Sequence, residues 1–324
     1  MTHDSATIRT KKDFASDTPV KWCPGCGDYA ILASLQSALA TLGVRTEDTV
    51  IISGIGCSGR LPYYMSTFGF HTLHGRAPAV ATGLKLARPE LSVWVIVGDG
   101  DGLSIGANHL LHLMRRNLNI NILLVNNQIY GLTKGQFSPT SAKGKKTGTS
   151  PLGSLENPVN PILFALLAGA SFVARSVDTD KQHLEPLLAQ AHAHPGCAFI
   201  EILQNCHVFN DGVFAGIRDK KNRDEEVVFL ENQQPLVFGH TRQKAICCHD
   251  YALSVEAVSA AELPSNIVIH NASNPGLALL LAQLSDPVPL GIFKRMEAEQ
   301  YDAAFNAARA TDFASLQRQY EAEC

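Results

Sequence analysis

The stretch Val93–Gln136, VWVIVGDGDGLSIGANHLLHLMRRNLNINILLVNNQIYGLTKGQ, decides the fold of this chain. It begins with an apolar, β-branched run, Val93–Val97, which stops at the polar turn GDGD (residues 98–101). An amphipathic stretch with helical spacing follows, and a second apolar run, Ile120–Val125, comes after it. The order strand, loop, helix, strand predicts a βαβ unit of a parallel sheet, with its helix starting near Ser104.

Polar residues follow both of these strands at their carboxyl ends, the edge where open parallel sheets bind ligands. Gly98 and Gly100 let the backbone approach a ligand closely, because neither carries a Cβ atom. Asp99 offers a carboxylate oxygen and Asn127 an amide oxygen, the hard ligands that Mg²⁺ combines with phosphate oxygens. Gly-Asp-Gly alone would predict only a tight turn. Here 25 residues (101–125) separate it from Asn-Asn on the next strand, and that spacing resembles the thiamine diphosphate-binding motif.

The composition is that of a globular protein and not of a nucleic-acid binder: 324 residues, 45% hydrophobic, with a formal net charge of −3. Residues 1–22 hold no apolar core, so no signal peptide is expected. The longest apolar stretch, Ile162–Ala174, is too short to span a bilayer, and we expect a cytoplasmic protein without a membrane segment. Eight cysteines in such a chain indicate metal or redox chemistry more than disulfides.

Five apolar runs alternate with helical patterns, which predicts an α/β fold, a doubly wound and mostly parallel sheet. The predicted strands are Thr49–Ile52, Val93–Val97, Ile120–Val125, Ser171–Val177 and Cys197–Leu203. We expect an N-terminal arm (1–22), an α/β domain (23–210) and a C-terminal extension (211–324) that forms a subunit interface. Within the extension, only helices at Pro275–Ser285 and 297–323 are predicted. Residues 138–161 form a long loop, of a length typical of lids and interfaces.

Three further segments point to chemistry at the same sheet edge. Cys23-Pro24-Gly25-Cys26 precedes a helix, and such a C-x-x-C serves zinc, thiol redox or half of an iron–sulfur site. The glycine-rich run Gly54–Arg60 (GIGCSGR) follows a strand and places Cys57 in a loop beside Asp99. The run His71–Arg76 (HTLHGR) precedes a helix, and its two histidines and arginine favour contact with phosphate or substrate.

Taken in order, these segments resemble one family, the β (thiamine diphosphate-binding) subunits of the 2-oxoacid:ferredoxin oxidoreductases. The resemblance consists of CPGCGDYA, GIGCSGR, HTLHGRA, GDGD with NNQIYGLTKGQ, and a cysteine after the last strand. It covers Lys21–Phe209 in order, and Pro235–Gly239 and Pro289–Tyr301 more loosely. It departs at His207, where the family more often has proline.

The resemblance implies a role for each matching residue. A [4Fe–4S] cluster would be held by Cys23, Cys26, Cys57 and Cys206. Mg²⁺ would be held by Asp99, Asn127 and the backbone carbonyl of Ile129. Contacts to thiamine diphosphate would come from Ile55, Gly56, Cys57, Ser58, His74, Gly75, Arg76, Gly98, Gly100, Asp101, Gly131, Leu132 and Thr133. Catalytic roles fall to His74 and Arg60, and the Arg60 cation suits the distal carboxylate of a dicarboxylic 2-oxoacid.

The implied reaction is the coenzyme A-dependent oxidative decarboxylation of 2-oxoglutarate to succinyl-CoA and CO₂, or its reverse, with electrons passed through the cluster to ferredoxin. Residues 211–324 are too few for the second α/β domain that binds the pyrimidine ring, so we expect an α subunit and an α₂β₂ heterotetramer. Three alternatives remain: a pyruvate or broad-range 2-oxoacid enzyme of the same family, a non-redox thiamine-dependent lyase, and a zinc-stapled interaction module.

Overall fold

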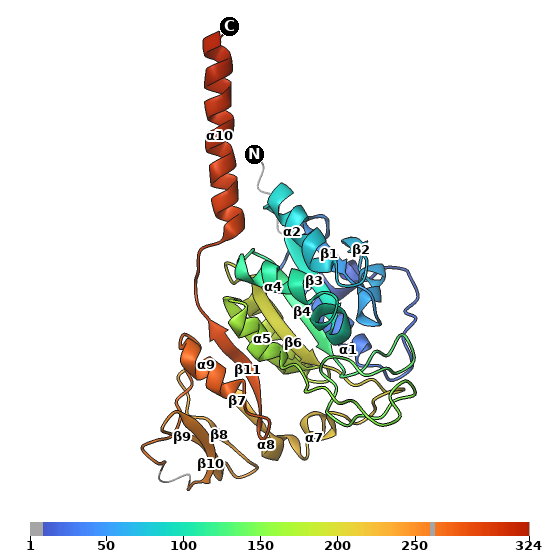
Figure 1. Cartoon of the computed structure of the whole chain (residues 1–324), viewed down its shortest axis with the longest axis vertical. Helices are drawn as coiled ribbons and strands as arrows, with labels where there is room; N and C mark the ends of the chain where they lie inside the picture. The colour runs from blue at the N-terminus through green and yellow to red at the C-terminus, as the bar shows by residue number, and fades with distance from the viewer. Residues whose placement is uncertain (1–8, 260–262, 324) are drawn as a thin grey trace.

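The computed structural model describes residues 9–259 and 263–323, and its centre is one eight-stranded sheet (Figure 1). The strand order is β2-β1-β3-β4-β6-β5-β11-β7. Six of these strands are mutually parallel: β1 (Thr49–Ser53), β2 (Phe68–His71), β3 (Ser92–Gly98), β4 (Asn121–Asn126), β5 (Phe172–Val177) and β6 (Ala198–Leu203). The predicted α/β fold with a mostly parallel sheet is therefore confirmed. β2, which the sequence did not predict, is exposed along its whole length.

Helices cover both faces of the sheet, as the continuous apolar strands require. On one face, Trp94 and Ile96 of β3 pack in a core with α1 (Asp28–Thr41) and α6 (Lys181–His192). On the other face, Val93, Val95 and Val97 pack in a second core with four helices. These are α2 (Ala77–Ala87), α4 (Ala107–Arg115), α5 (Pro161–Leu167) and α9 (Pro275–Leu281).

The central βαβ unit differs from the prediction in one respect, because two helices stand where one was expected. The short α3 (Asp99–Leu103) begins directly after β3, and α4 begins only at Ala107. Ser104 between them has a non-helical backbone, with φ −102° and ψ −105°. A Cβ on Gly106 would lie 2.4 Å from the Asp101 carbonyl oxygen, so this tight reversal requires glycine. Asp99 is thereby buried at the end of β3.

The chain beyond residue 210 contributes more regular structure than the sequence predicts. β11 (Val288–Arg295) joins the main sheet antiparallel to β5, and β7 (Val227–Leu230) pairs parallel with β11. A separate antiparallel sheet contains β8 (Val237–Phe238), β9 (Lys244–His249) and β10 (Ala252–Ala257). Two short helices also lie in this part of the chain, α7 (Ala215–Arg218) and α8 (Arg223–Glu226). Three 3₁₀ helices lie near the N-terminus: η1 (Lys11–Phe14), η2 (Thr46–Asp48) and η3 (Ser58–Tyr64).

The two helices predicted beyond residue 210 are present as α9 and α10 (Tyr301–Glu323), and α10 extends away from the body of the molecule (Figure 1). Within 9–259 and 263–323, no helix combines the length and the apolar character needed to cross a membrane. The division of the chain at residues 22 and 210, and the role of the extension as an interface, stay predictions. Residues 1–8 of the arm lie outside the described part.

Candidate active site

The carboxyl edge of the sheet surrounds a cavity of about 160 Å³, and most of the predicted cofactor residues line it. They are Ile55, Gly56, Cys57, Ser58, His74, Gly98, Asp99, Gly100, Asp101, Asn127, Ile129, Gly131, Leu132 and Thr133. Three predicted residues lie just outside it. Gly75 bonds to Asp101 behind the cavity wall, the Arg76 guanidinium faces the Ile105 carbonyl at 3.5 Å, and Arg60 lines an adjoining cavity.

Asp99, the predicted metal ligand, is held rigidly in this wall. It is only 2% exposed, and its Oδ2 accepts hydrogen bonds of 2.5 Å from the hydroxyls of both Ser138 and Thr140. Burial raises the pKa of Asp99 to about 6, and the two hydroxyl hydrogen bonds oppose that rise. The site therefore contains a desolvated but well-oriented carboxylate.

The loop after β4 supplies further oxygen donors to the same cavity. Asn127 Oδ1 accepts a 3.1 Å bond from the Ile129 N–H, which folds the loop so that both residues line the cavity. Within the described chain, no three His, Cys, Asp or Glu side chains gather closely enough to hold a metal ion. Mg²⁺ does not need such a group, since it binds one or two carboxylates and takes its other oxygens from phosphate and water. The Asp99 carboxylate, Asn127 amide and Ile129 carbonyl fit that donor set.

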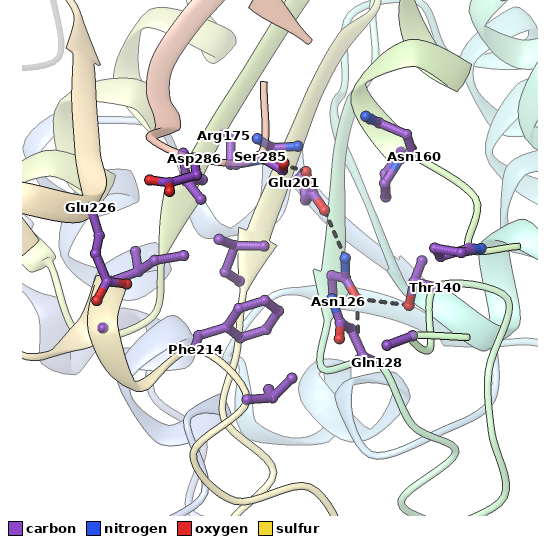
Figure 2. A pocket seen from close by; sticks show the side chains of 18 of the residues that line it. Asn126, Gln128, Thr140, Asn160, Arg175, Glu201, Phe214, Glu226, Ser285 and Asp286 are labelled. Carbon is purple, nitrogen blue, oxygen red and sulfur yellow. Dashed lines mark hydrogen bonds and ion pairs between the residues drawn. The ribbon is translucent and has the colours of Figure 1, made fainter. Parts of the chain in front are cut away.

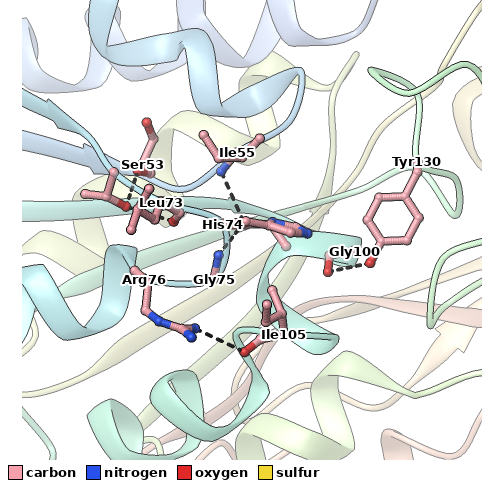
Figure 3. Close-up of polar contacts among 11 residues, drawn as sticks. Ser53, Ile55, Leu73, His74, Gly75, Arg76, Gly100, Ile105 and Tyr130 are labelled. Atoms are coloured by element: carbon pink, nitrogen blue, oxygen red, sulfur yellow. Dashed lines mark hydrogen bonds and ion pairs between the residues drawn. The ribbon is translucent and has the colours of Figure 1, made fainter.

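Asp101 ties together two loops beside the cavity, those of Ile55 and of His74-Gly75, which Figure 3 labels. Its Oδ1 accepts bonds from the N–H groups of Ile55 (3.1 Å) and Gly75 (2.7 Å) and pairs with His74 Nδ1 at 2.5 Å. Its Oδ2 is buried without a hydrogen-bond partner. Gly75 has φ +69°, and a Cβ there would lie 2.5 Å from the Gly106 nitrogen, so only glycine fits this crossing. Asp101 thus orients the His74 ring through Nδ1.

The four predicted cluster cysteines lie on three segments, and the structure brings the sulfurs of two of them, Cys57 and Cys206, near one point. The C-x-x-C turn packs against the end of β6, where Gln204 Nε2 donates to Cys26 Sγ at 3.3 Å. The Cβ position of Gly131 lies 3.4 Å from Cys206 Sγ and 3.6 Å from Cys57 Sγ, which places these two sulfurs around one point. Cys57 also lines the cofactor cavity.

Electrostatics shows the same convergence. The pKa of Cys57 is raised to about 12, chiefly by burial, next by the Asp28 carboxylate and then by the neighbouring thiols of Cys206 and Cys23. Four free thiols are the donor set of a [4Fe–4S] cluster, although the described side chains are not gathered closely enough to hold a metal as they stand. Binding iron lowers a thiol pKa strongly. Cys197, by contrast, is fully buried in the apolar core. The cysteine pattern therefore fits the predicted cluster.

Arg60 lines a second cavity of about 480 Å³, which shares Ile55, Gly56 and Leu132 with the first. Lys21 and His71 line it too, and the described residues around it include no carboxylate. Arg60 does not line the first cavity itself, but it contributes a positive charge to the cavity that adjoins it.

A family model described as "Thiamine pyrophosphate enzyme, C-terminal TPP binding domain" matches residues 54–202. The 2-oxoglutarate oxidoreductase subunit KorB of Mycobacterium tuberculosis is 50% identical over 299 residues, 90% of this chain and 80% of that protein. The 2-oxoacid:ferredoxin oxidoreductase 1 subunit beta of Aeropyrum pernix is 49% identical over 59% of this chain and 60% of that protein. The chain belongs to the β subunits of the 2-oxoacid:ferredoxin oxidoreductases.

A solved structure agrees with this family. It is the 2-oxoglutarate:ferredoxin oxidoreductase from Magnetococcus marinus with 2-oxoglutarate, coenzyme A and succinyl-CoA bound. It matches with a TM-score of 0.75 and 35% identity, over 94% of this chain and 91% of that chain. As a β subunit of this family, the chain is part of an oxidoreductase and contains its thiamine diphosphate-binding domain.

Four residues of this β subunit's site were not predicted from the sequence: Asp28, Tyr130, Ser138 and Thr140. Asp28 lines the cavity, and its pKa is raised to about 7 by burial, against a lowering effect of its hydrogen bond with Cys26. Tyr130 also lines the cavity, and its hydroxyl donates to the Gly100 carbonyl at 2.9 Å. Asp28 could have been found from its position, because it directly follows the cysteine motif CPGCG. Ser138 and Thr140 could have been found from the hydroxyl-rich run SPTS at the start of the long loop.

Proposed function

We propose that this β subunit serves the oxidative decarboxylation of 2-oxoglutarate to succinyl-CoA and CO₂, or the reverse carboxylation, with ferredoxin as electron carrier. The observation that carries the proposal is the gathering of the predicted cofactor residues around one cavity, with Cys57 in its wall and Cys206 close to Cys57. The names of the Mycobacterium and Magnetococcus proteins support 2-oxoglutarate as substrate, and the Magnetococcus structure also supports coenzyme A and ferredoxin.

Thiamine diphosphate, when bound, supplies the carbon nucleophile that attacks the 2-oxo group. Asp99, Asn127 and the Ile129 carbonyl would hold Mg²⁺ against its diphosphate, and the glycines of residues 98–100 and Gly131 let the backbone approach. His74 would hold or release a proton at Nε2, because Asp101 occupies its Nδ1.

A [4Fe–4S] cluster, when bound, accepts electrons one at a time and passes them to ferredoxin. Cys23, Cys26, Cys57 and Cys206 would be its ligands, and Cys57, which also lines the cofactor cavity, would bring it close to the reacting carbon. This position favours an oxidoreductase over a non-redox lyase, because electrons left after loss of CO₂ have a nearby acceptor.

An α subunit would complete the active site. Beyond residue 210 the described strands extend the main sheet or form a small antiparallel sheet, and they do not build a second parallel α/β domain. The pyrimidine-side carboxylate that thiamine enzymes need is therefore expected from a partner chain, and we propose an α₂β₂ complex. The relatives' names, which call them β subunits, support this assignment.

Arg60 would select the substrate by pairing with the distal carboxylate of 2-oxoglutarate, with Lys21 adding positive charge. A broader 2-oxoacid range is the second candidate, supported by the name of the Aeropyrum relative. A charge-assisted pair of about 2–3 kcal/mol corresponds to a discrimination of about 10²-fold.

The test uses Arg60→Ala in the assembled αβ complex. We expect kcat/KM for 2-oxoglutarate to fall by about 10²-fold while that for pyruvate changes little. Arg88→Ala is the control, since Arg88 pairs only with Glu90 at the surface. An equal loss on both substrates would assign Arg60 to the cofactor or the fold and refute the substrate role.

A further inference from the structure

The run SPTS (Ser138–Ser141) forms a turn that contacts both halves of the proposed metal-ligand set. Ser138 and Thr140 are 2% and 3% exposed, and both hydroxyls lie 2.5 Å from Asp99 Oδ2. Neither hydroxyl bonds Oδ1. Two donors on one carboxylate oxygen fix the plane of the carboxylate and leave the other oxygen to a cation.

The same turn reaches the loop after β4. Ser141 Oγ donates to the Gln128 carbonyl at 2.6 Å and accepts a 2.8 Å bond from the Ser138 N–H. Gln128 stands between Asn127 and Ile129, the two other proposed ligands, and its own φ is +56°. A residue in this left-handed conformation needs outside support, and Ser141 supplies part of it.

Each hydroxyl of the turn has one proton to donate, and one proton each is enough for the hydrogen bonds described above. Thr140 Oγ1 has one proton and two acceptors nearby, Asp99 Oδ2 at 2.5 Å and Asn126 Oδ1 at 3.0 Å. The charged and closer oxygen is the stronger acceptor, so the proton is directed to Asp99. Asn126 Oδ1 keeps a donor of its own in the Gln128 N–H at 3.2 Å. Each hydroxyl of the turn thus serves one acceptor.

Asn126, which Thr140 contacts, is itself held by a buried ion pair, and Figure 2 shows Asn126 between Thr140 and Glu201. Asn126, the last residue of β4, donates through Nδ2 to Glu201 Oε1 at 2.7 Å, and Glu201 Oε2 pairs with Arg175 Nε at 2.6 Å. A cavity of about 850 Å³ is lined in part by Asn126, Thr140, Arg175 and Glu201. Buried, paired side chains on neighbouring strands hold Asn126 still, and Asn126 in turn contacts Thr140.

We propose that the Ser138–Ser141 turn is a positioning element for the metal site. It orients the Asp99 carboxylate through two hydroxyls and the 127–129 loop through a third. The proposal rests on the proposed Mg²⁺ role of Asp99. The two serines and the threonine would act through the metal's ligands and not bind the metal themselves. Removing such support typically weakens metal binding by about 10–100-fold.

The test measures binding of Mn²⁺, a hard cation that replaces Mg²⁺ and is visible by electron paramagnetic resonance, to the assembled complex with thiamine diphosphate. Ser138→Ala and Thr140→Val should each raise the Kd for Mn²⁺ by about 10-fold, and Thr140→Ser, which restores the hydroxyl, by less than about 2-fold. Thr147→Val is the control, because its hydroxyl bonds only Thr149 within the same loop.

Asp99→Asn separates the two possible failures. If it raises the Kd by more than about 100-fold while Ser138→Ala and Thr140→Val stay within about 2-fold of wild type, the positioning role is wrong and the metal role stands. If Asp99→Asn leaves the Kd unchanged, the proposed metal site is wrong and the positioning role is lost with it. Should Thr140→Val prevent assembly, Ser138→Ala gives the same test, since it removes a hydroxyl from the same oxygen and no buried carbon.

Discussion

Replacing Arg175 by methionine is expected to destabilise the full-length chain by about 3–5 kcal/mol. Arg175 on β5 lies directly opposite Glu201 on β6, with Nε 2.6 Å from Oε2 and side-chain exposures of 8% and 2%. Methionine keeps much of the arginine stem but lacks the guanidinium, whose Cζ lies 5.4 Å from the centroid of the Phe293 ring. The perturbation therefore removes the positive charge and little packing volume.

The magnitude follows from the carboxylate that remains. Without Arg175, buried Glu201 keeps one side-chain donor, Asn126 Nδ2 at 2.7 Å, and no cation. Leaving one partner of a buried ion pair alone costs about 3–5 kcal/mol, whereas replacing both partners by neutral groups is close to neutral. The double variant Arg175→Met/Glu201→Gln keeps a hydrogen-bond acceptor for Asn126. Its free energy of unfolding should therefore lie within about 1–2 kcal/mol of that of wild type.

The assay is urea unfolding of the full-length chain at pH 7.5, followed by far-ultraviolet circular dichroism. Arg88→Met is the control, because its ion pair with Glu90 is exposed and should contribute little to stability. The reasoning would be refuted if the free energy of unfolding of Arg175→Met lay within about 1 kcal/mol of wild type. It would also be refuted if the double variant were no more stable than Arg175→Met.

Three further outcomes are expected. Cys206→Ser should lower iron content and ferredoxin reduction in anaerobically purified complex, while Cys197→Ser, in the apolar core, leaves both near wild type; the reverse result would show that the fourth ligand is misassigned. Expressed without its α subunit, the chain should bind little thiamine diphosphate in calorimetry and turn over no 2-oxoacid, and robust activity alone would contradict the incomplete site. Burial lowers the pKa of His194 to about 4 from its ordinary 6.5, so the unfolded chain binds the proton first as pH falls. The free energy of unfolding should then drop by about 2 kcal/mol between pH 6.5 and 4, and His194→Gln should show a shallower slope in urea titrations across that range.

The five parallel strands of the core could be predicted because each is a short, nearly unbroken apolar run, and a strand covered by helices on both faces needs no polar side. β7 and β11, which complete the same sheet, could not be predicted. β11 is interrupted by a shift of register between Ile292 and Lys294. Its pairing with β5 also joins segments more than 100 residues apart. The local pattern does not encode such a pairing, because its energy comes from the partner strand.

At the site, the sequence determined which residues face the cofactor cavity, since glycines and hard-oxygen ligands stand in contiguous runs where strands end. Tertiary structure alone decided what each does there. Asp101 bonds the N–H groups of Ile55 and Gly75, residues 46 and 26 positions away, and Asp99 is held by Ser138 and Thr140, 39 and 41 positions away. The path of a loop fixes such contacts, and no periodicity in the sequence reports that path. A strand end can be read locally, but the neighbours of a buried carboxylate depend on how distant segments fold back over it.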